Sequence, residues 1–464
     1  MIRISMKNIL FAAALTLMFF SCKAPGELNR GTAATDQLYG DTLITDSASL
    51  ADMPWERLFT DARLRDLIKE GLENNPDLQL AAQRVIQAEA YFAQGKASLF
   101  PSLTAQGGAG YVHRPKTLYP DGPRDVKDYQ LNLQASWEVD IWGKLRSSKR
   151  AAYASLLASD AGEKAVRTGL IAAIANTYYS LMGLDEQLKI TRQTVETNID
   201  LVETMKLLKS SGQVTGAAVV QTEALRYAAE VTIPDLEQTI RETENTMCLL
   251  LGRTPGKIER GRLEEQKLPS LIKTGVPVRL LDNRPDVMEA EYNLMNAYEL
   301  TRNARAYFYP ALTITASAGL ESTDLNTLLD PDAFVANLIG GLTAPLFNKR
   351  TNVTRLKVAR SQQEQALISF RNSLLTAGQE VNNAMGQYQA SEKKRMLREQ
   401  QLSALEKSVS YSRELLTYGS ATYTEVLNAQ QSLLGAQLSQ VSDHLQQLNA
   451  VVSVYRALGG GWKD

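Results

Sequence analysis

The strongest constraint on this chain is an internal repeat that fills most of its 464 residues. Asn75–Asp77 recurs as Arg284–Asp286, and Phe100–Leu103 recurs as Tyr309–Leu312, both 209 residues later (285 − 76 and 310 − 101). Three further pairs follow in the same order: Trp142–Lys144 with Phe347–Lys349, Gly212 with Gly419, and Gly252 with Gly459. An ordered series at a nearly constant offset indicates duplication. We expect a first repeat over 61–260 and a second over 261–464.

Each copy is predicted to contain a helix, two strands and two long helices joined by a turn. Residues 78–97 have the pattern of the first such helix. Residues 131–140 and 312–320 alternate between apolar and polar side chains, which predicts strands with one face of each kind. Their length and alternation match a membrane barrel strand, although a half-buried strand of a soluble sandwich has the same pattern. Less regular partner strands are expected near 102–113 and 334–346.

Very long helices are predicted to follow each pair of strands. No proline occurs between Pro123 and Pro234, and none follows Pro345. Helix-forming residues dominate 146–209 and 352–417, so each helix would be about 95 Å long at ~1.5 Å per residue. Pro234 is expected to kink one helix. The last helix carries apolar residues with the 4-3-4-3 spacing of a coiled coil, at Leu434, Leu438, Val441, Leu445, Leu448, Val452 and Tyr455.

The predicted strands constrain the state of assembly. Four strands per chain cannot close a barrel, for which about eight are needed. Open strand edges cannot face lipid, because each unpaired N–H or C=O group costs several kcal/mol there. If the strands enter a membrane, the chain must therefore associate. Two copies with eight strands and three copies with twelve both satisfy this requirement, and the residues alone leave the choice open.

The N-terminus has the pattern of an export signal. A short positively charged stretch precedes an apolar segment that is too short to span a bilayer. We expect a signal peptide over 1–21 and an extended tether over 22–60. The ending Phe19–Cys22 resembles a bacterial lipobox, which implies a lipid anchor on Cys22 made of a diacylglycerol and an N-acyl chain such as palmitate. An ordinary signal peptide, cut nearby, is the alternative.

Several motifs resemble those of the TolC-like outer-membrane efflux lipoproteins, the outer-membrane factors of resistance-nodulation-division type efflux systems. Trp137–Leu145 resembles the family's strand-to-helix signature, as do Asn283–Val287 and Phe308–Pro310. Leu250–Pro255 is similar to its motif at the end of the first repeat, and 418–430 is similar to its second helical tip. Three aromatic residues either lie at the membrane interface or pack at the junction of strands and helices: Trp142, Phe308 and Tyr309.

The resemblance covers nearly all of the chain after the signal peptide and implies an α+β membrane protein with a TolC-like fold. Each protomer of a homotrimer would contribute four strands to a twelve-stranded outer-membrane barrel, and long helices to a coiled-coil barrel across the periplasm. The implied partners are a periplasmic adaptor protein, an inner-membrane pump, usually of the resistance-nodulation-division type, and outer-membrane lipid. The chain would be a passive exit duct for drugs or other toxic small molecules.

The turns that join the long helices are the predicted contacts with the adaptor. Glycine suits a tight reversal because it tolerates positive φ. Thr215 and Thr422 are expected to cap the helices that follow. By resemblance, the two turns form periplasmic tips that meet the adaptor through Gly212, Val214, Thr215, Gly419, Ser420 and Thr422. A plain helix turn without a partner is the alternative.

Glu425 lies about one helical turn after the second tip. By resemblance, it matches a position at which an acidic side chain lines the closed aperture, and Asn428 matches a second such position. Threefold symmetry would bring three Glu425 carboxylates to one opening, and acidic rings attract cations. The counterpart of Glu425 in the first copy is Ala218, so the two tips are expected to differ. A solvated glutamate outside any gate is the alternative.

Nothing in the sequence indicates an enzyme, a cofactor, a metal site or nucleic-acid binding. We find no Gly-rich phosphate loop and no catalytic triad, and His113 and His444 are expected to be structural or solvated. The formal net charge of −1 gives no basic stripe for nucleic acid. The alternative function is a periplasmic coiled-coil scaffold lipoprotein without channel activity. The exported compound is left open, because the family as a whole handles drugs, detergents and metal cations.

Overall fold

The structure is a computed structural model that describes residues 53–118, 120–266 and 283–463. The predicted signal peptide, Cys22 and most of the predicted tether lie outside the described residues. The described end of the tether forms a short helix, α2 (Trp55–Leu58), whose two terminal residues are buried. Part of this segment is therefore packed against the core.

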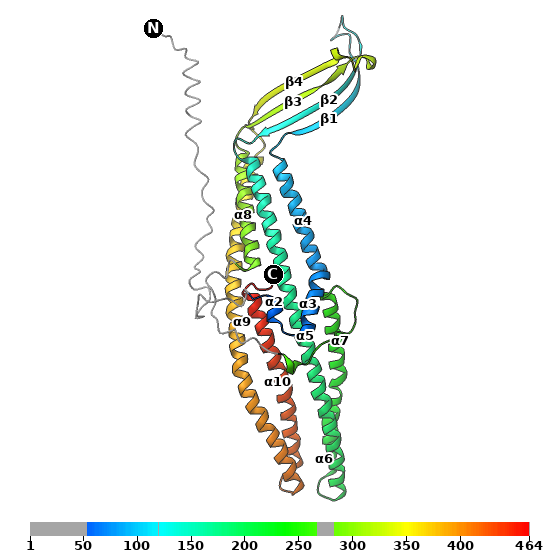
Figure 1. The fold of residues 1–464 in the computed structure, drawn as a ribbon, viewed down its shortest axis with the longest axis vertical. Helices are drawn as coiled ribbons and strands as arrows, with labels where there is room; N and C mark the ends of the chain where they lie inside the picture. The colour runs from blue at the N-terminus through cyan, green and yellow to red at the C-terminus, as the bar shows by residue number, and fades with distance from the viewer. Residues whose placement is uncertain (1–52, 119, 267–282, 464) are drawn as a thin grey trace, which may run out of the picture. The chain divides into compact units, whose positions relative to one another are not determined.

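The two repeats form the same series of elements, except that the last helix of the second repeat corresponds to two helices in the first (Figure 1). The first repeat contains α4 (Pro76–Ala97), β1 (Ser102–His113), β2 (Asp125–Val139), α5 (Lys144–Ser210), α6 (Gly216–Glu230) and α7 (Thr232–Leu250). The second contains α8 (Pro285–Ala306), β3 (Ala311–Ser322), β4 (Phe334–Thr343), α9 (Thr351–Thr417) and α10 (Tyr423–Ala457). Four shorter elements complete the description: α3 (Ala62–Asn74), η3 (Leu263–Glu265), η5 (Leu325–Thr327) and η6 (Pro331–Ala333). The predicted order of helix, strands and long helical hairpin is confirmed in both copies.

A polar residue before a proline begins each repeat and ties it to the end of the same repeat. Proline is the first residue of both α4 and α8, where its missing N–H breaks no helix bond. The Asn75 side chain donates to the carbonyl of Leu250 at 2.8 Å, at the end of α7. Arg284 occupies the same place in the second copy, and its guanidinium donates to the carbonyl of Ala457 at 3.1 Å, at the end of α10. The same closure thus uses an amide in one copy and a buried cation in the other.

The four strands form one antiparallel sheet in the order β1-β2-β3-β4. Its register places an apolar row across all four strands, namely Leu103, Ala135, Ala316 and Leu338. The next row is polar across all four strands, namely Thr104, Gln134, Ser317 and Asn337. Because successive side chains of a strand point to opposite faces, the sheet has one apolar face and one polar face. The alternation predicted for 131–140 and 312–320 is confirmed. The partner strands are less regular, as predicted, since Val335 and Ile339 of β4 lie on the same side as Asn337.

Both edges of this sheet are unpaired within the described part of the chain. β1 forms one edge and pairs only with β2, while β4 forms the other edge and pairs only with β3. Every residue of β1 is solvent-exposed, and so are most residues of β4. Long exposed edges are templates for pairing with another strand.

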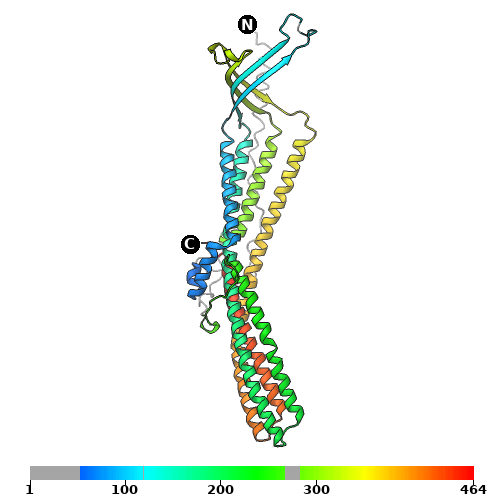
Figure 2. The ribbon, with the colours of Figure 1, turned by 90° about the vertical axis from the view of Figure 1, so that its right-hand side faces the viewer.

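The helices pack in a sequence that follows the strands. α4 contacts α5, α5 contacts α8, and α8 contacts α9 (Figures 1 and 2). α5 and α9 each contain 67 residues, which corresponds to about 100 Å at ~1.5 Å per residue. The sheet adjoins their N-terminal ends, and the two hairpin turns follow their C-terminal ends.

The main hydrophobic core lies around the middle of α5, where α3, α7, α9 and α10 converge. Tyr178 of α5 is fully buried, and its hydroxyl donates to Asp61 at 2.8 Å and accepts from the backbone N–H of Gly261 at 3.0 Å. The heptad residues of α10 face inward as predicted: Val441, Leu448, Val452 and Tyr455 are buried, and the other three are half-buried. The coiled-coil pattern therefore marks a packed seam.

Pro234 does interrupt a helix, as predicted. α6 ends at Glu230 and α7 begins at Thr232, so the break lies just before Pro234. Proline cannot donate to the carbonyl four residues earlier, and its ring clashes with that carbonyl. That carbonyl belongs to Glu230, which is the last residue of α6.

One predicted pairing between the repeats is wrong. The sequence pairs Trp142–Lys144 with Phe347–Lys349, but the helices that follow begin at Lys144 and Thr351, which are 207 residues apart (351 − 144). The residue before α5 is Gly143 with φ of 76°, and its true counterpart before α9 is Arg350 with φ of 64°. Similar aromatic and basic residues two positions away produced the error. A side chain in the left-handed region is uncommon outside glycine, so this second junction is locally strained.

Candidate functional site

The two hairpin turns have the same backbone structure. After α5, the N–H of Gly212 donates to the Lys209 carbonyl at 3.0 Å, and the next N–H donates to the Leu208 carbonyl at 2.9 Å. After α9, the N–H groups of Gly419 and Ser420 make the same two bonds, at 3.0 and 2.9 Å. This is the Schellman motif, which requires a left-handed residue just past the helix end. The two glycines supply it, with φ of 74° and 69°, as the sequence predicts.

The predicted caps of the second helix in each hairpin are only partly correct. Thr215 and Thr422 both occupy the N-cap position of α6 and α10, but neither hydroxyl accepts a hydrogen bond from the helix. Their backbone carbonyls accept instead, from the N–H groups of Ala218 and Glu425, each at 3.1 Å. Both threonines are solvent-exposed, so water can satisfy the remaining N–H groups. The hydroxyls are left free for other contacts.

Five of the six predicted contact residues at the tips are solvent-exposed. They are Gly212, Thr215, Gly419, Ser420 and Thr422. Val214 is half-buried and packs against a small apolar cluster behind the turns. The exposed residues belong to the two separate turns that follow α5 and α9.

The cluster behind the turns was missed by sequence reasoning, and we refer to it as the tip cluster. Its buried members are Leu201 and Met205 of α5, Val219 of α6 and Val426 of α10. It therefore packs the first hairpin against the second, close to the tips. Val219 and Val426 are themselves a repeat pair, 207 residues apart, which was the available signal.

The predicted aperture residues lie on an exposed face of α10. Glu425 and Asn428 are both solvent-exposed and are spaced three residues apart, so they share one side of the helix. Glu425 lies in the first turn, where a carboxylate is stabilised by the helix dipole. Its counterpart Ala218 is fully buried, so the two tips differ in both charge and exposure.

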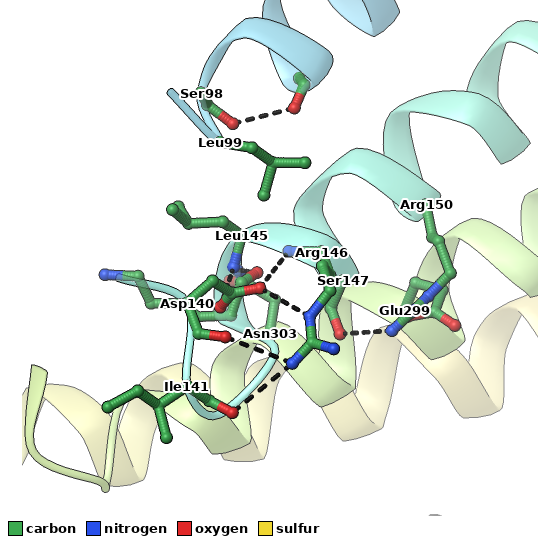
Figure 3. A network of polar contacts seen from close by, with 12 residues as sticks. Ser98, Leu99, Asp140, Ile141, Leu145, Arg146, Ser147, Arg150, Glu299 and Asn303 are labelled. Carbon is green, nitrogen blue, oxygen red and sulfur yellow. Dashed lines mark hydrogen bonds and ion pairs between the residues drawn. The ribbon is translucent and has the colours of Figure 1, made fainter. Parts of the chain in front are cut away.

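The junction between β2 and α5 explains the signature over Trp137–Leu145 (Figure 3). The Asp140 carboxylate accepts from the backbone N–H groups of Leu145 and Arg146 at 3.0 and 2.9 Å, and from the Arg146 side chain at 3.0 Å. Although partial burial acts to raise the pKa of Asp140, these hydrogen bonds lower it below its ordinary value. Asp140 thus caps α5 and fixes the angle between strand and helix.

Aromatic packing joins the two repeats at the same junction. The Trp142 ring stacks on Tyr309 with ring centres 4.9 Å apart, and its indole N–H donates to the Pro310 carbonyl at 2.8 Å. For these two residues, packing is therefore the better of the two roles considered. Phe308 is half-exposed.

The remaining polar candidates have structural surroundings. His113 lies at the end of β1, with its Nδ1 atom 2.7 Å from the Asp125 carboxylate. Burial lowers the pKa of His444 on α10, which favours its neutral form. Within residues 53–118, 120–266 and 283–463, no cluster of three or more His, Cys, Asp or Glu residues could hold a metal ion.

No helix in the described part of the chain is both long enough and apolar enough to cross a membrane.

Comparisons with known proteins agree with this geometry. The sequence pattern of the outer membrane efflux protein family matches residues 67–253 and 276–460. The chain is 28% identical over 474 residues to the cation efflux system protein CusC of Escherichia coli, with 99% of each chain covered. It is 30% identical over 460 residues to the pyoverdine export outer membrane protein OpmQ of Pseudomonas putida, with 97% of this chain and 96% of that one covered.

Solved structures share the fold. A structure of CusC has a TM-score of 0.81 at 25% identity, covering 90% of this chain and 100% of that one. The open state of the MtrE channel of Neisseria gonorrhoeae has a TM-score of 0.82 at 25% identity, covering 92% and 95%. The predicted TolC-like α+β fold with a duplicated repeat is confirmed, and the efflux relatives favour a channel over a scaffold. The chain therefore belongs to the outer membrane efflux protein family and is an efflux duct of the outer membrane.

Proposed function

We propose that three copies of this chain form one passive exit duct across the outer membrane and the periplasm. The observation that carries the proposal is the sheet, which has a continuous apolar face and two unpaired edges. Eight strands from two copies would close a barrel filled by its own side chains, whereas twelve strands from three copies give a wider barrel. The apolar face would meet lipid and the polar face would line the passage.

The tips are proposed as the contact with a periplasmic adaptor, which would connect the duct to an inner-membrane pump, usually of the resistance-nodulation-division type. The support is the exposure of Gly212, Thr215, Gly419, Ser420 and Thr422, together with the two free hydroxyls. The tip cluster would hold the two turns in one spatial relation, so that the adaptor meets a defined surface. Energy would be consumed at the inner membrane, and the chain itself would catalyse no reaction.

Glu425 and Asn428 are proposed to line the closed aperture of the trimer. Both side chains are exposed on one face of α10, and Glu425 lies one turn from the tip. Three copies around an axis would place three carboxylates at one opening, where they would attract cations. Asn428 supplies no charge, so the ring would hold three carboxylates and no more.

The cargo is proposed to be a toxic small molecule that the pump selects. CusC is named for cations, OpmQ for pyoverdine, and a third relative, TtgI of Pseudomonas putida, for toluene. Because these compounds differ so much in chemistry, we infer that the pump, and not the duct, selects the exported compound. We further propose that Cys22 carries the lipid anchor, and that 61–260 and 261–464 are the two repeat units.

The test combines assembly, conductance and export. The purified full-length protein should run as a heat-modifiable trimer, originate from outer-membrane fractions and form channels in planar bilayers. Deleting the gene should raise sensitivity to at least one toxic compound, and the wild-type gene should reverse this. A monomeric protein without conductance would contradict the proposal, and so would a gene deletion that changes the sensitivity to no toxic compound.

A further inference from the structure

A cleft with a polar lining lies between α5, α9 and α10, and we refer to it as the polar cleft. It has a volume of about 230 Å³. Along α10 it lies between Val441 of the main hydrophobic core and Val426 of the tip cluster. Four amide side chains and one guanidinium are among the groups that line it, namely those of Gln193, Asn198, Gln430, Gln437 and Arg413. A polar layer therefore lies between two apolar ones.

Two of these amides have no hydrogen-bond partner in the part of the chain that the structure describes. Both amide atoms of Gln430, the nitrogen and the oxygen, are buried and unpaired. Asn198 is only 2% exposed, and its side chain forms no hydrogen bond there either. Buried polar side chains almost always have a partner, because an unpaired one loses its hydrogen bonds to water without replacement. The polar cleft therefore needs an occupant that forms hydrogen bonds.

The polar cleft is positively charged. Arg413 is the one charged residue among the described residues that line it. Its guanidinium forms no ion pair within residues 53–118, 120–266 and 283–463. Water would satisfy the amides, but an anion would accept hydrogen bonds from the amide N–H groups and also pair with the guanidinium. The combination of an unpaired cation and unpaired amides therefore favours an anion.

The equivalent place in the first hairpin contains charges of both signs. The second helix of each hairpin begins at Gly216 and Tyr423, which gives an offset of 207 residues (423 − 216). Arg413 therefore corresponds to Lys206, and Gln430 to Glu223. The Lys206 Nζ atom lies 2.9 Å from the Glu203 carboxylate and 4.0 Å from the Glu223 carboxylate. In the first repeat, the cation at this position thus has two carboxylate neighbours within the chain.

The second repeat keeps the cation at this position but has none of the neighbouring carboxylates. In the first hairpin a further ion pair, between Arg226 and Glu230 at 2.9 Å, lies close by on α6. The five charged residues Glu203, Lys206, Glu223, Arg226 and Glu230 correspond to Ser410, Arg413, Gln430, Leu433 and Gln437. Two cations and three carboxylates, with a formal charge of −1, thus become one cation with a formal charge of +1. A bound anion would supply the missing negative charge.

We propose that the polar cleft binds one small monovalent anion, held by the Arg413 guanidinium and by the amide N–H groups of Gln430 and Asn198. A single charge fits because one cation lines the cleft, and a second buried negative charge would have no compensating partner. Chloride is the simplest anion of this class, and its spherical charge accepts hydrogen bonds from any direction. The site lies within one copy of the chain, so the inference goes beyond the proposed duct and does not depend on it.

The bound anion would connect the two hairpins behind their tips. Asn198 belongs to α5 of the first hairpin, whereas Arg413 and Gln430 belong to α9 and α10 of the second. α10 contacts both α5 and α9 (Figure 1). A ligand that binds only this arrangement of the three helices stabilises it. The anion would therefore act together with the tip cluster to hold the hairpins in one spatial relation.

Thermal unfolding of the full-length protein in detergent tests the site. Replacing gluconate by chloride, from ~1 to ~300 mM at constant ionic strength, leaves the screening of surface charges unchanged. The midpoint of unfolding should rise by roughly 2 °C, because a ligand of the folded state stabilises it and the chain is long. Arg371→Gln, which removes another exposed arginine of α9, is the control and should respond to chloride as the wild type does.

The decisive variant restores the charge of the first hairpin. Gln430→Glu places a carboxylate where the first repeat has Glu223, so Arg413 should gain a partner within the chain. The midpoint of this variant at low chloride should exceed that of the wild type, and it should no longer rise with chloride. Arg413→Gln should also lose the response to chloride, but without the gain in stability. A general effect of salt would instead act equally on all the variants.

Crystals grown in bromide provide a direct check. One bromide per copy should appear beside Gln430 and Asn198, located by its anomalous scattering. If no bromide lies there, or if Gln430→Glu responds to chloride as the wild type does, ordered water alone fills the cleft and the proposal is wrong. If a carboxylate of a neighbouring copy pairs with Arg413, the wild type will not respond to chloride, which would also overturn the proposal. The proposed duct is tested separately, by channel conductance.

Discussion

At the residue scale, the two repeats place different side chains at equivalent positions near the tips. Ala218 is fully buried, whereas Glu425 is exposed in the first turn of α10. The neighbouring pair, Val219 and Val426, is buried in both copies and forms the tip cluster. The valine position is therefore used for packing in both repeats. The position before it is a buried alanine in the first repeat and an exposed, charged glutamate in the second.

The first prediction concerns that charge. Glu425→Gln should weaken the block of channel conductance by divalent cations in planar bilayers, because the aperture loses its carboxylates. Asn428→Asp should strengthen the block, since it adds a second charge on the same face. Glu414→Gln, an exposed glutamate on α9, is the control and should behave as the wild type. Equal block in Glu425→Gln and the wild type would exclude Glu425 from the aperture.

At the scale of elements, each helical hairpin depends on one glycine at its reversal. Gly212 and Gly419 both have positive φ and close the same pair of hydrogen bonds. Open space surrounds both residues, so a methyl group would clash with nothing. The cost of a substitution there is therefore a backbone cost alone.

The second prediction concerns this backbone cost. Gly212→Ala and Gly419→Ala should each destabilise the protein by about 1 kcal/mol, because a left-handed conformation disfavours a Cβ atom. Gly435→Ala is the control, since Gly435 lies within α10, is also surrounded by open space and does not have positive φ. It should stabilise the helix by up to about 1 kcal/mol. Thermal unfolding of the three variants in detergent checks the opposite signs, and the same sign in all three would contradict the argument.

At the scale of the whole molecule, the two faces of the sheet have opposite tolerances for charge. Ala316 belongs to the apolar row and Ser317 to the adjacent polar row of the same strand. Lysine on a lipid-facing position near the middle of a membrane costs about 2–4 kcal/mol, whereas a position facing the lumen tolerates it.

The third prediction uses these neighbours as a matched pair. Ala316→Lys should prevent most of the protein from forming the heat-modifiable trimer. Ser317→Lys should assemble normally and should lower the conductance for cations. Gel mobility before and after heating, followed by bilayer recordings, separates the two effects. If the apolar face does not meet lipid, the two variants will assemble equally well.

Much of the fold followed from periodicity. The strands over 131–140 and 312–320, the helices over 146–209 and 352–417, and the seam of α10 all depend on which side chains share a face, and a sequence shows this directly. The hairpin turns could also be predicted, because glycine just after a helix end readily adopts the positive φ that the turn requires. The error at the β4–α9 junction arose because Trp142–Lys144 was matched to Phe347–Lys349 by residue type, whereas the constant offset of 207 residues matches it to 349–351.

The repeat, the alternation of the strands and the length of the helices could all be predicted from the amino-acid sequence, since these properties depend on neighbours along the chain. Which helix surfaces contact one another could be seen only in the tertiary structure. The tip cluster and the contact of α5 with α8 both join residues far apart in sequence. Such contacts depend on distances between elements, and the spacing of residues along a chain does not encode those distances.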